Sequence, residues 1–167
     1  MIPPLRIAHR GASGQGLAPE NTLAACEKAI QLGVDAIEID VHATRDGQIV
    51  VLHDPSIDRT TDGAGLVVDL SADQVRQADA GSWFGTDFAG ERIPLLEEVL
   101  DLARHRAMVL VEIKAEFITE RILQVIDTVA AAEHVIVQSF NPATVERVKL
   151  LAPVLPTALL VGQLPTT

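Results

Sequence analysis

Short apolar runs of strand character alternate with amphipathic helical patterns along most of this chain, and this alternation limits the possible folds more than any other feature. The run AMVLVEI at 107–113 is nearly continuous in apolar residues, as is typical of a strand buried on both faces. Strands are predicted at 5–8, 35–41, 107–113, 134–138 and 157–161, and helices at 22–32, 94–103, 118–129 and 141–152. Because strand–helix–strand units pair their strands in parallel through right-handed crossovers, the sequence predicts an α/β fold.

One segment breaks this alternation after the second predicted strand. Asp46-Gly47 is a strong hairpin signal, and the run QIVVLH at 48–53 is predicted to return antiparallel to the preceding strand. Residues 54–93 are polar and rich in glycine, and a capping box at 71–74 predicts a short helix within them. We therefore expect residues 42–93 to form a hairpin and an insertion inside the larger α/β unit.

The charge balance and the cysteine content narrow the classes of partner. The chain carries 13 Lys and Arg against 23 Asp and Glu, a net charge of −10. Nucleic acids and anionic membranes are bound through clustered positive charge, so we expect neither as a partner. Cys26 is the only cysteine, which excludes a disulfide framework and a thiolate zinc cluster within one chain. With no signal-peptide pattern and no apolar run of ~20 residues, we expect a cytoplasmic protein without stable membrane insertion.

Two carboxylates stand two residues apart in the second predicted strand, at Glu38 and Asp40. Side chains at this spacing share one face of a strand, and without a cation they would repel and raise each other's pKa. If Asp46-Gly47 forms a two-residue turn, Asp40 lies opposite His53, and opposed residues project to the same face with Cβ atoms ~5 Å apart. The sequence therefore predicts a cluster of Glu38, Asp40 and His53.

Further polar side chains end the neighbouring strands. His9 and Arg10 follow the first predicted strand, and Glu112 and Lys114 end the next main strand after the insertion. Ligands of parallel α/β sheets and barrels bind at the carboxyl ends of the strands, so we expect these side chains to converge on one end. The three carboxylates are hard oxygen ligands, which favour Mg²⁺ or Ca²⁺ over zinc.

An ordered set of short motifs resembles the glycerophosphodiester phosphodiesterases. AHRGASGQGLAPENT, EIDV, VLHD, RTTDG, VEIK and QSFN occur in that order over residues 7–141. The resemblance implies a TIM (β/α)8 barrel with a small insertion after the second strand. It also implies His9 and His53 as the general acid/base pair, Glu38, Asp40 and Glu112 as ligands of a divalent metal, Arg10 and Lys114 as phosphate ligands, and Asn21 as a residue lining the site.

The activity implied by the resemblance is metal-dependent hydrolysis of glycerophosphodiesters to an alcohol and sn-glycerol 3-phosphate, part of lipid and glycerol metabolism. Two histidines can activate an oxygen nucleophile and protonate an alkoxide, each worth ~10²–10⁴-fold in rate. One alternative is a lysophospholipase D-like phosphodiesterase, for whose acyl groove the sequence offers only Trp83, Phe84 and Phe88. The other is a non-catalytic phosphodiester-binding domain. The headgroup alcohol, the choice between Mg²⁺ and Ca²⁺, the assignment of acid and base, and the oligomeric state stay open. The nucleophile also stays open: it is either water or a neighbouring glycerol hydroxyl that passes through a cyclic phosphate.

One departure from this family concerns length. A TIM barrel usually takes ~250 residues, whereas this chain has 167 and five predicted main strands. We expect residues 1–167 to be a single glycerophosphodiester phosphodiesterase domain that is truncated at its C-terminus and covers about five of the eight barrel strands.

Overall fold

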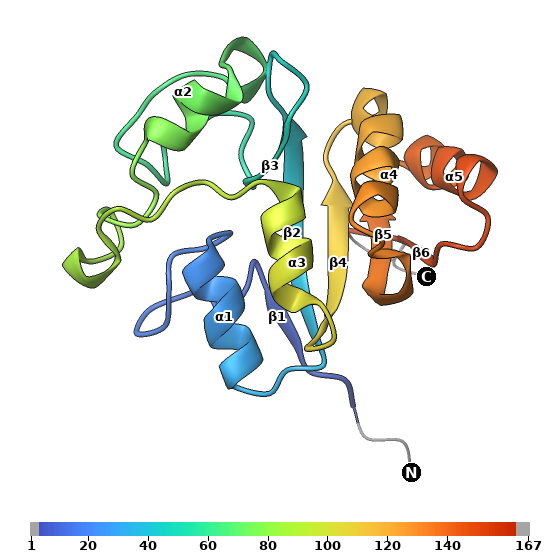
Figure 1. The fold of residues 1–167 in the computed structure, drawn as a ribbon, viewed down its shortest axis with the longest axis horizontal. Helices are drawn as coiled ribbons and strands as arrows, with labels where there is room; N and C mark the ends of the chain where they lie inside the picture. Colours follow the sequence, from blue (N-terminus) through green and yellow to red (C-terminus); the bar gives the residue numbers. More distant parts are fainter. Residues whose placement is uncertain (1–3, 163–167) are drawn as a thin grey trace.

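Five parallel strands form the frame of the molecule in the computed structural model, which describes residues 4–162 (Figure 1). They are β1 (Ile7–His9), β2 (Ala36–Ala43), β4 (Met108–Ile113), β5 (Val135–Ser139) and β6 (Thr157–Leu159), and they lie side by side in this order. The short β3 (Ile49–Val51) pairs antiparallel with the end of β2. The predicted α/β fold is confirmed, because these five strands are parallel and helices alternate with them along the chain. Apart from β3, each strand pairs with the next one in the sequence, as in a (β/α)8 barrel.

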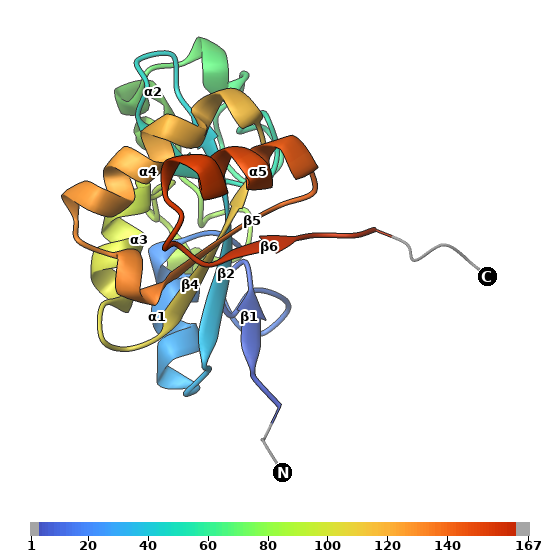
Figure 2. The ribbon, with the colours of Figure 1, turned by 90° about the vertical axis from the view of Figure 1, so that its right-hand side faces the viewer.

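Helices cover one face of this sheet (Figure 2). They are α1 (Leu23–Gln31), α3 (Leu96–Ala103), α4 (Thr119–Thr128) and α5 (Pro142–Leu151), and each packs against the next in this order. The insertion carries α2 (Ala72–Gln77), and short 3₁₀ turns occur at Val67–Asp69, Thr86–Phe88, Glu116–Ile118 and Ala132–His134. The predicted capping box is confirmed at Ser71. Within residues 4–162, none of the helices is long and apolar enough to cross a membrane.

Strand β2 has an apolar face toward the core and a polar face on the other side of the sheet. Ile37, Ile39 and Val41 are fully buried in the main apolar cluster, which lies between the sheet and the helices. Because side chains alternate along a strand, Glu38 and Asp40 project to the opposite face. One short run of sequence therefore supplies both apolar contacts to the helices and carboxylates to the other side.

The insertion between β3 and α3 has a small core of its own. Its buried apolar residues are Val50, Leu52, Ile57, Val67, Val75, Ala78, Ala80 and Ile93. The cluster is separate from the main core, and β3 contributes to both, since Ile49 and Val51 belong to the main cluster. The insertion is therefore a packed unit that is fixed to the sheet through β3.

The hairpin that joins β2 to β3 has a different register from the predicted one. The backbone N–H of Thr44 donates to the carbonyl of Gln48 (2.9 Å), and the N–H of Leu52 donates to the carbonyl of Asp40 (2.9 Å). The loop therefore contains three residues rather than two, and Leu52 lies opposite Asp40. The prediction that His53 lies opposite Asp40 is wrong by one residue.

The cause of this shift is local turn chemistry. Gly47 adopts a left-handed φ of 80°, the conformation that closes a three-residue hairpin loop. The Thr44 hydroxyl donates to Asp46 (2.6 Å) and accepts from the N–H of Gln48 (3.0 Å), which stabilises the wider loop. His53 lies beyond the last residue of β3, so strand alternation does not decide where its side chain points.

Two glycines of the β1–α1 loop allow a test of how closely this loop must approach α1. Gly11 has a φ of 76°, and a Cβ placed there would lie 2.7 Å from the Cβ of Ala25 and 2.8 Å from its carbonyl carbon. Gly16 has a nearly identical φ of 78° and open space around the same position. Gly16→Ala should lower the free energy of unfolding by about 1 kcal/mol, the cost of a left-handed alanine.

Gly11→Ala should cost that amount plus a further ~1–3 kcal/mol, because the loop must move away from α1. Denaturant unfolding of the two variants measures the difference. Equal losses of stability would contradict the close approach.

Candidate active site

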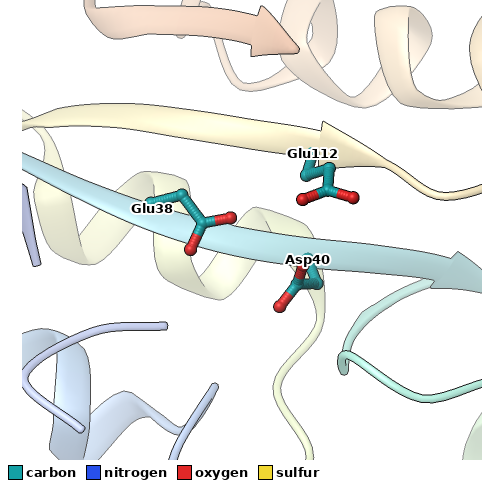
Figure 3. A group of neighbouring side chains, drawn as sticks. All are labelled: Glu38, Asp40 and Glu112. Carbon is teal, nitrogen blue, oxygen red and sulfur yellow. The ribbon is translucent and has the colours of Figure 1, made fainter. Parts of the chain in front are cut away.

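The polar residues singled out in the sequence meet at the carboxyl ends of β1, β2 and β4. His9, the last residue of β1, is in register with Glu38 of β2, and Asp40 is in register with Glu112 of β4. Figure 3 shows the carboxylates of β2 and β4 on the same side of the sheet. The parallel pairing thus brings together residues that are more than 70 positions apart in the chain.

The three carboxylates form a buried cluster. Glu38, Asp40 and Glu112 each offer one carboxylate oxygen, and these oxygens lie within 4.8 Å of one another. Burial, together with the negative charges of Asp40 and Glu112, raises the pKa of Glu38 to about 7. A set of three close, buried carboxylates fits a hard divalent cation such as Mg²⁺ or Ca²⁺, which takes oxygen ligands and would relieve this repulsion.

Lys114 supplies positive charge to this cluster. Its Nζ lies 2.7 Å from Asp40 Oδ1 and 2.6 Å from Glu112 Oε1. Burial alone would raise the pKa of Asp40, but the Lys114 ammonium and the Asn21 amide outweigh it and lower that pKa. Burial also opposes the charge of Lys114, yet the two carboxylates raise its pKa. The structure thus places Lys114 among the carboxylates, while its role as a phosphate ligand stays a prediction.

Asn21 orients Asp40 through two hydrogen bonds. Its side-chain amide donates to Asp40 Oδ2 (2.9 Å), and its Oδ1 accepts from the backbone N–H of Asp40 (3.3 Å). Asn21 is buried and has a left-handed φ of 56°, a conformation that asparagine tolerates better than most residues. The next residue, Thr22, caps α1. Asn21 thus orients a carboxylate of the cluster from the turn that starts the first helix.

Arg10 joins the β1–α1 loop to the cluster in two ways. Its backbone N–H donates to Glu38 Oε2 (3.0 Å), and its guanidinium donates to Glu20 (2.8 Å). The Arg10 Nε lies 3.5 Å from Asp40 Oδ2. Arg10 therefore places its positive charge beside Asp40 and a backbone donor on Glu38.

The two histidines differ in their surroundings. The side chain of His9 is 71% exposed, and its Nε2 lies 3.9 Å from Glu38 Oε2. His53 is partly buried, and its Nδ1 lies 2.7 Å from Asp54 Oδ1. The ring of His42 donates from Nε2 to the carbonyl oxygen of His53 (3.1 Å), since a carbonyl can only accept. His53 is thus held by both its ring and its backbone, whereas His9 has freer access to solvent.

One cleft of about 400 Å³ brings most of these residues together. Its lining includes His9, Arg10, Glu38, Asp40, His53, Glu112 and Lys114, with Leu110, Gln138, Phe140 and Leu160. His53 therefore reaches the cleft despite the error in the predicted hairpin register. Asn21, which the family resemblance implies as a residue lining the site, is not part of the lining of this cleft and contacts the site through Asp40.

Four polar residues with contacts to this site had no role in the sequence-based prediction. Gln138 of β5 donates to Glu38 (3.5 Å). Glu20, Asp54 and Arg59 form ion pairs that extend from Arg10 and His53. All four belong to the motifs that carry the family resemblance, and membership in these motifs was the only sequence feature that could have pointed to them. Their spacing along the sequence does not predict that they contact Arg10, His53 or Glu38.

Comparisons with known proteins agree with the fold and identify the family. The model of the glycerophosphoryl diester phosphodiesterase family matches residues 9–166. A glycerophosphodiester phosphodiesterase from Caldanaerobacter subterraneus is 44% identical over 162 residues, which cover 93% of this chain and 66% of that protein. A glycerophosphodiester phosphodiesterase structure from Agrobacterium tumefaciens has a TM-score of 0.82 at 33% identity, over 90% of this chain and 64% of that one.

A phosphodiesterase from Oleispira antarctica, solved in complex with the product sn-glycerol-3-phosphate, has a TM-score of 0.81 at 34% identity. That match covers 90% of this chain and 63% of the other. This chain thus spans between 63% and 66% of the length of these three proteins. The extent of the family match and the identity to these proteins lead to one conclusion: the chain belongs to the glycerophosphoryl diester phosphodiesterase family.

Proposed function

We propose that this chain hydrolyses glycerophosphodiesters to an alcohol and sn-glycerol 3-phosphate, with a divalent metal and two histidines. The observation that carries this proposal is a single cleft that holds His9, His53, the three buried carboxylates and the cations of Arg10 and Lys114. The Oleispira antarctica relative, which was solved with sn-glycerol-3-phosphate, supports the same product here. The cytoplasmic location stays a prediction.

Glu38, Asp40 and Glu112 are the proposed ligands of Mg²⁺ or Ca²⁺. Such a cation, when bound, would neutralise charge on the phosphodiester and help to ionise an attacking oxygen. Arg10 and Lys114 flank the carboxylates and are the proposed phosphate ligands. Their positive charge offsets the local carboxylates in a chain whose net charge of −10 would otherwise oppose an anionic substrate.

His9 and His53 are the proposed acid/base pair. If His53 donates its Nδ1–H to Asp54, its Nε2 is the ring atom left to exchange a proton with the substrate. One histidine would take a proton from the attacking oxygen, which belongs either to water or to a neighbouring glycerol hydroxyl, as the new P–O bond forms; if the hydroxyl attacks, the product is a cyclic phosphate that water opens in a second step. The other would give a proton to the alcohol oxygen as the old P–O bond breaks. The proton balance is then complete without another acid or base.

The lysophospholipase D-like alternative depends on the aromatic residues of the insertion. Trp83 packs edge-to-face on Phe84, and Phe84 packs in the same way on Phe88. Trp83 and Phe84 line a second cleft of about 460 Å³ with the β1–α1 loop, and Trp83 is 44% exposed. The lysophospholipase D-like alternative would require the acyl chain of the substrate to reach this second cleft, so substrates with such a chain should be included in the test.

A diester panel tests the proposed function. We expect release of sn-glycerol 3-phosphate from glycerophosphodiesters, loss of turnover on exhaustive chelation, and recovery with Mg²⁺ or Ca²⁺. Faster turnover of lysophospholipids would favour the lysophospholipase D-like alternative. Binding of diesters without turnover at any metal concentration would favour the non-catalytic alternative. Full activity after chelation would contradict the assignment of the three carboxylates.

The raised pKa of Glu38 gives a second test, on stability rather than activity. Its folded pKa of about 7 lies above the ordinary value of 4.5, so the folded chain retains a proton that the unfolded chain releases. Without metal, the free energy of unfolding should therefore fall between pH 4.5 and about 7, by an amount on the order of 3 kcal/mol, and then level off. Urea unfolding across this range measures the fall.

Glu38→Gln is the matched control for this pH dependence. It should remove most of the fall, because the amide does not titrate. Saturating Mg²⁺ or Ca²⁺ should also reduce the fall in the unmodified chain, because a cation favours the ionised carboxylate. An identical pH dependence in Glu38→Gln would show that other groups cause it.

The histidine roles can be separated by the choice of leaving group. His9→Ala and His53→Ala should each lower kcat by ~10²-fold or more on a natural diester. A nitrophenyl diester has an acidic leaving group that needs no proton, so it should rescue only the variant that lacks the acid. His105→Ala, a substitution at an exposed site outside the cleft, is the control. Near-normal activity of both variants on a natural diester would exclude the acid/base pair.

A further inference from the structure

A chain of ion pairs runs from the insertion to the β1–α1 loop, and Arg59 is its centre. The guanidinium donates to Asp54 from Nε (2.6 Å) and Nη2 (3.2 Å). It also donates to Glu20 from Nη1 (3.0 Å) and Nη2 (2.7 Å). One planar cation thus binds two carboxylates, each through both carboxylate oxygens. This geometry suits arginine and cannot be reproduced by the single ammonium of lysine.

Both carboxylates continue into the proposed active site. Asp54 Oδ1 lies 2.7 Å from Nδ1 of His53. Glu20 Oε1 accepts from the guanidinium of Arg10 (2.8 Å). Asp54 therefore connects Arg59 to His53, a proposed acid/base group, and Glu20 connects it to Arg10, a proposed phosphate ligand. The side chain of Arg59 itself does not line the active-site cleft.

The contact with Asp54 bears on the ring of His53. Hydrogen bonds from Arg59 hold the pKa of the Asp54 carboxyl below its usual range, which keeps the group ionised. An ionised carboxylate can only accept, so it selects the His53 tautomer with the proton on Nδ1. Because Arg59 donates a hydrogen bond to each oxygen of Asp54, the carboxylate cannot rotate freely. The orientation of the His53 ring, which contacts this carboxylate, is fixed with it.

We propose that Arg59 is a positioning residue that sets the orientation and tautomer of His53 through Asp54 and anchors Arg10 through Glu20. The proposal rests on the proposed function for the roles of His53 and Arg10. It assigns Arg59, the first residue of the RTTDG motif, to positioning of site residues rather than to contact with the substrate. Arg59 is 45% exposed, so its place is explained better by these four hydrogen bonds than by packing.

Another arginine of the insertion provides a matched comparison. Arg76 of α2 binds both oxygens of Glu98 at 2.5 and 2.8 Å. That pair resembles the Arg59 contacts in geometry and joins the insertion to α3, but neither member lines the active-site cleft. A purely structural role for Arg59 predicts that Arg59→Gln and Arg76→Gln behave alike, apart from modest losses of stability.

The kinetic test compares Arg59→Gln, Arg59→Lys, Asp54→Asn and Arg76→Gln. We expect Arg59→Gln and Asp54→Asn each to lower kcat roughly 10- to 100-fold, with smaller changes in KM. Arg59→Lys should recover part of the loss, because it keeps the charge without the bidentate grip. The double variant Asp54→Asn/Arg59→Gln should lose less kcat than the product of the two single losses, since the effect of Arg59 on His53 passes through Asp54. Arg76→Gln should keep the unmodified kcat.

A second measurement is independent of turnover. In chain labelled with ¹⁵N-histidine, the NMR signals of His53 should report a single tautomer protonated at Nδ1. Arg59→Gln should give a mixture of tautomers, whereas Arg76→Gln should not. If the tautomer changes as expected but no form of the chain hydrolyses any diester, the positioning role stands and the proposed function fails. An unchanged His53 tautomer in Arg59→Gln overturns the proposal, as does a kcat equal to that of Arg76→Gln in an active enzyme.

Discussion

Repulsion among three buried carboxylates is the constraint on which the rest of this site depends. One carboxylate oxygen from each of Glu38, Asp40 and Glu112 lies within 4.8 Å of the others. At this upper limit, two full charges repel by on the order of 3 kcal/mol for an effective dielectric constant of about 20. Four neighbouring groups offset this repulsion with a hydrogen-bond donor or a positive charge. The donors are the Arg10 amide, the Asn21 amide, the Lys114 ammonium and the Gln138 amide. Each of these groups contacts at least one carboxylate of the cluster.

The two faces of β2 explain how the fold tolerates three buried carboxylates close together. Its odd positions pack under the helices, and the loss of any large apolar side chain there would leave a cavity that typically costs 2–5 kcal/mol. This apolar anchoring holds the backbone of β2 in place while the even positions, Glu38 and Asp40, bear unfavourable charge. The stability of the core thus offsets the strain of the site within one strand.

The strands, the helices and the meeting of polar side chains at one end of the sheet could be predicted from the sequence, because they depend on alternation and on which strand ends meet. The geometry could not be predicted where one local detail decides it. The hairpin register depends on Gly47 and on the Thr44 side chain, and a two-residue and a three-residue loop share the same Asp-Gly signal. The pairing of Lys114 with Asp40 depends on the parallel register of β2 and β4. No spacing along the sequence encodes such contacts.

The ion pairs of Arg59 explain why the insertion needs a core of its own. Glu20 and Arg59 are 39 residues apart, and they come from the β1–α1 loop and from the insertion. A partly exposed ion pair between two mobile loops would be weak, because ordering both side chains costs entropy. The apolar cluster around Ile57 fixes the insertion, so the ion pairs of Arg59 require little further ordering of its backbone. The insertion can then transmit a fixed geometry to His53, which a flexible loop of the same sequence length could not do.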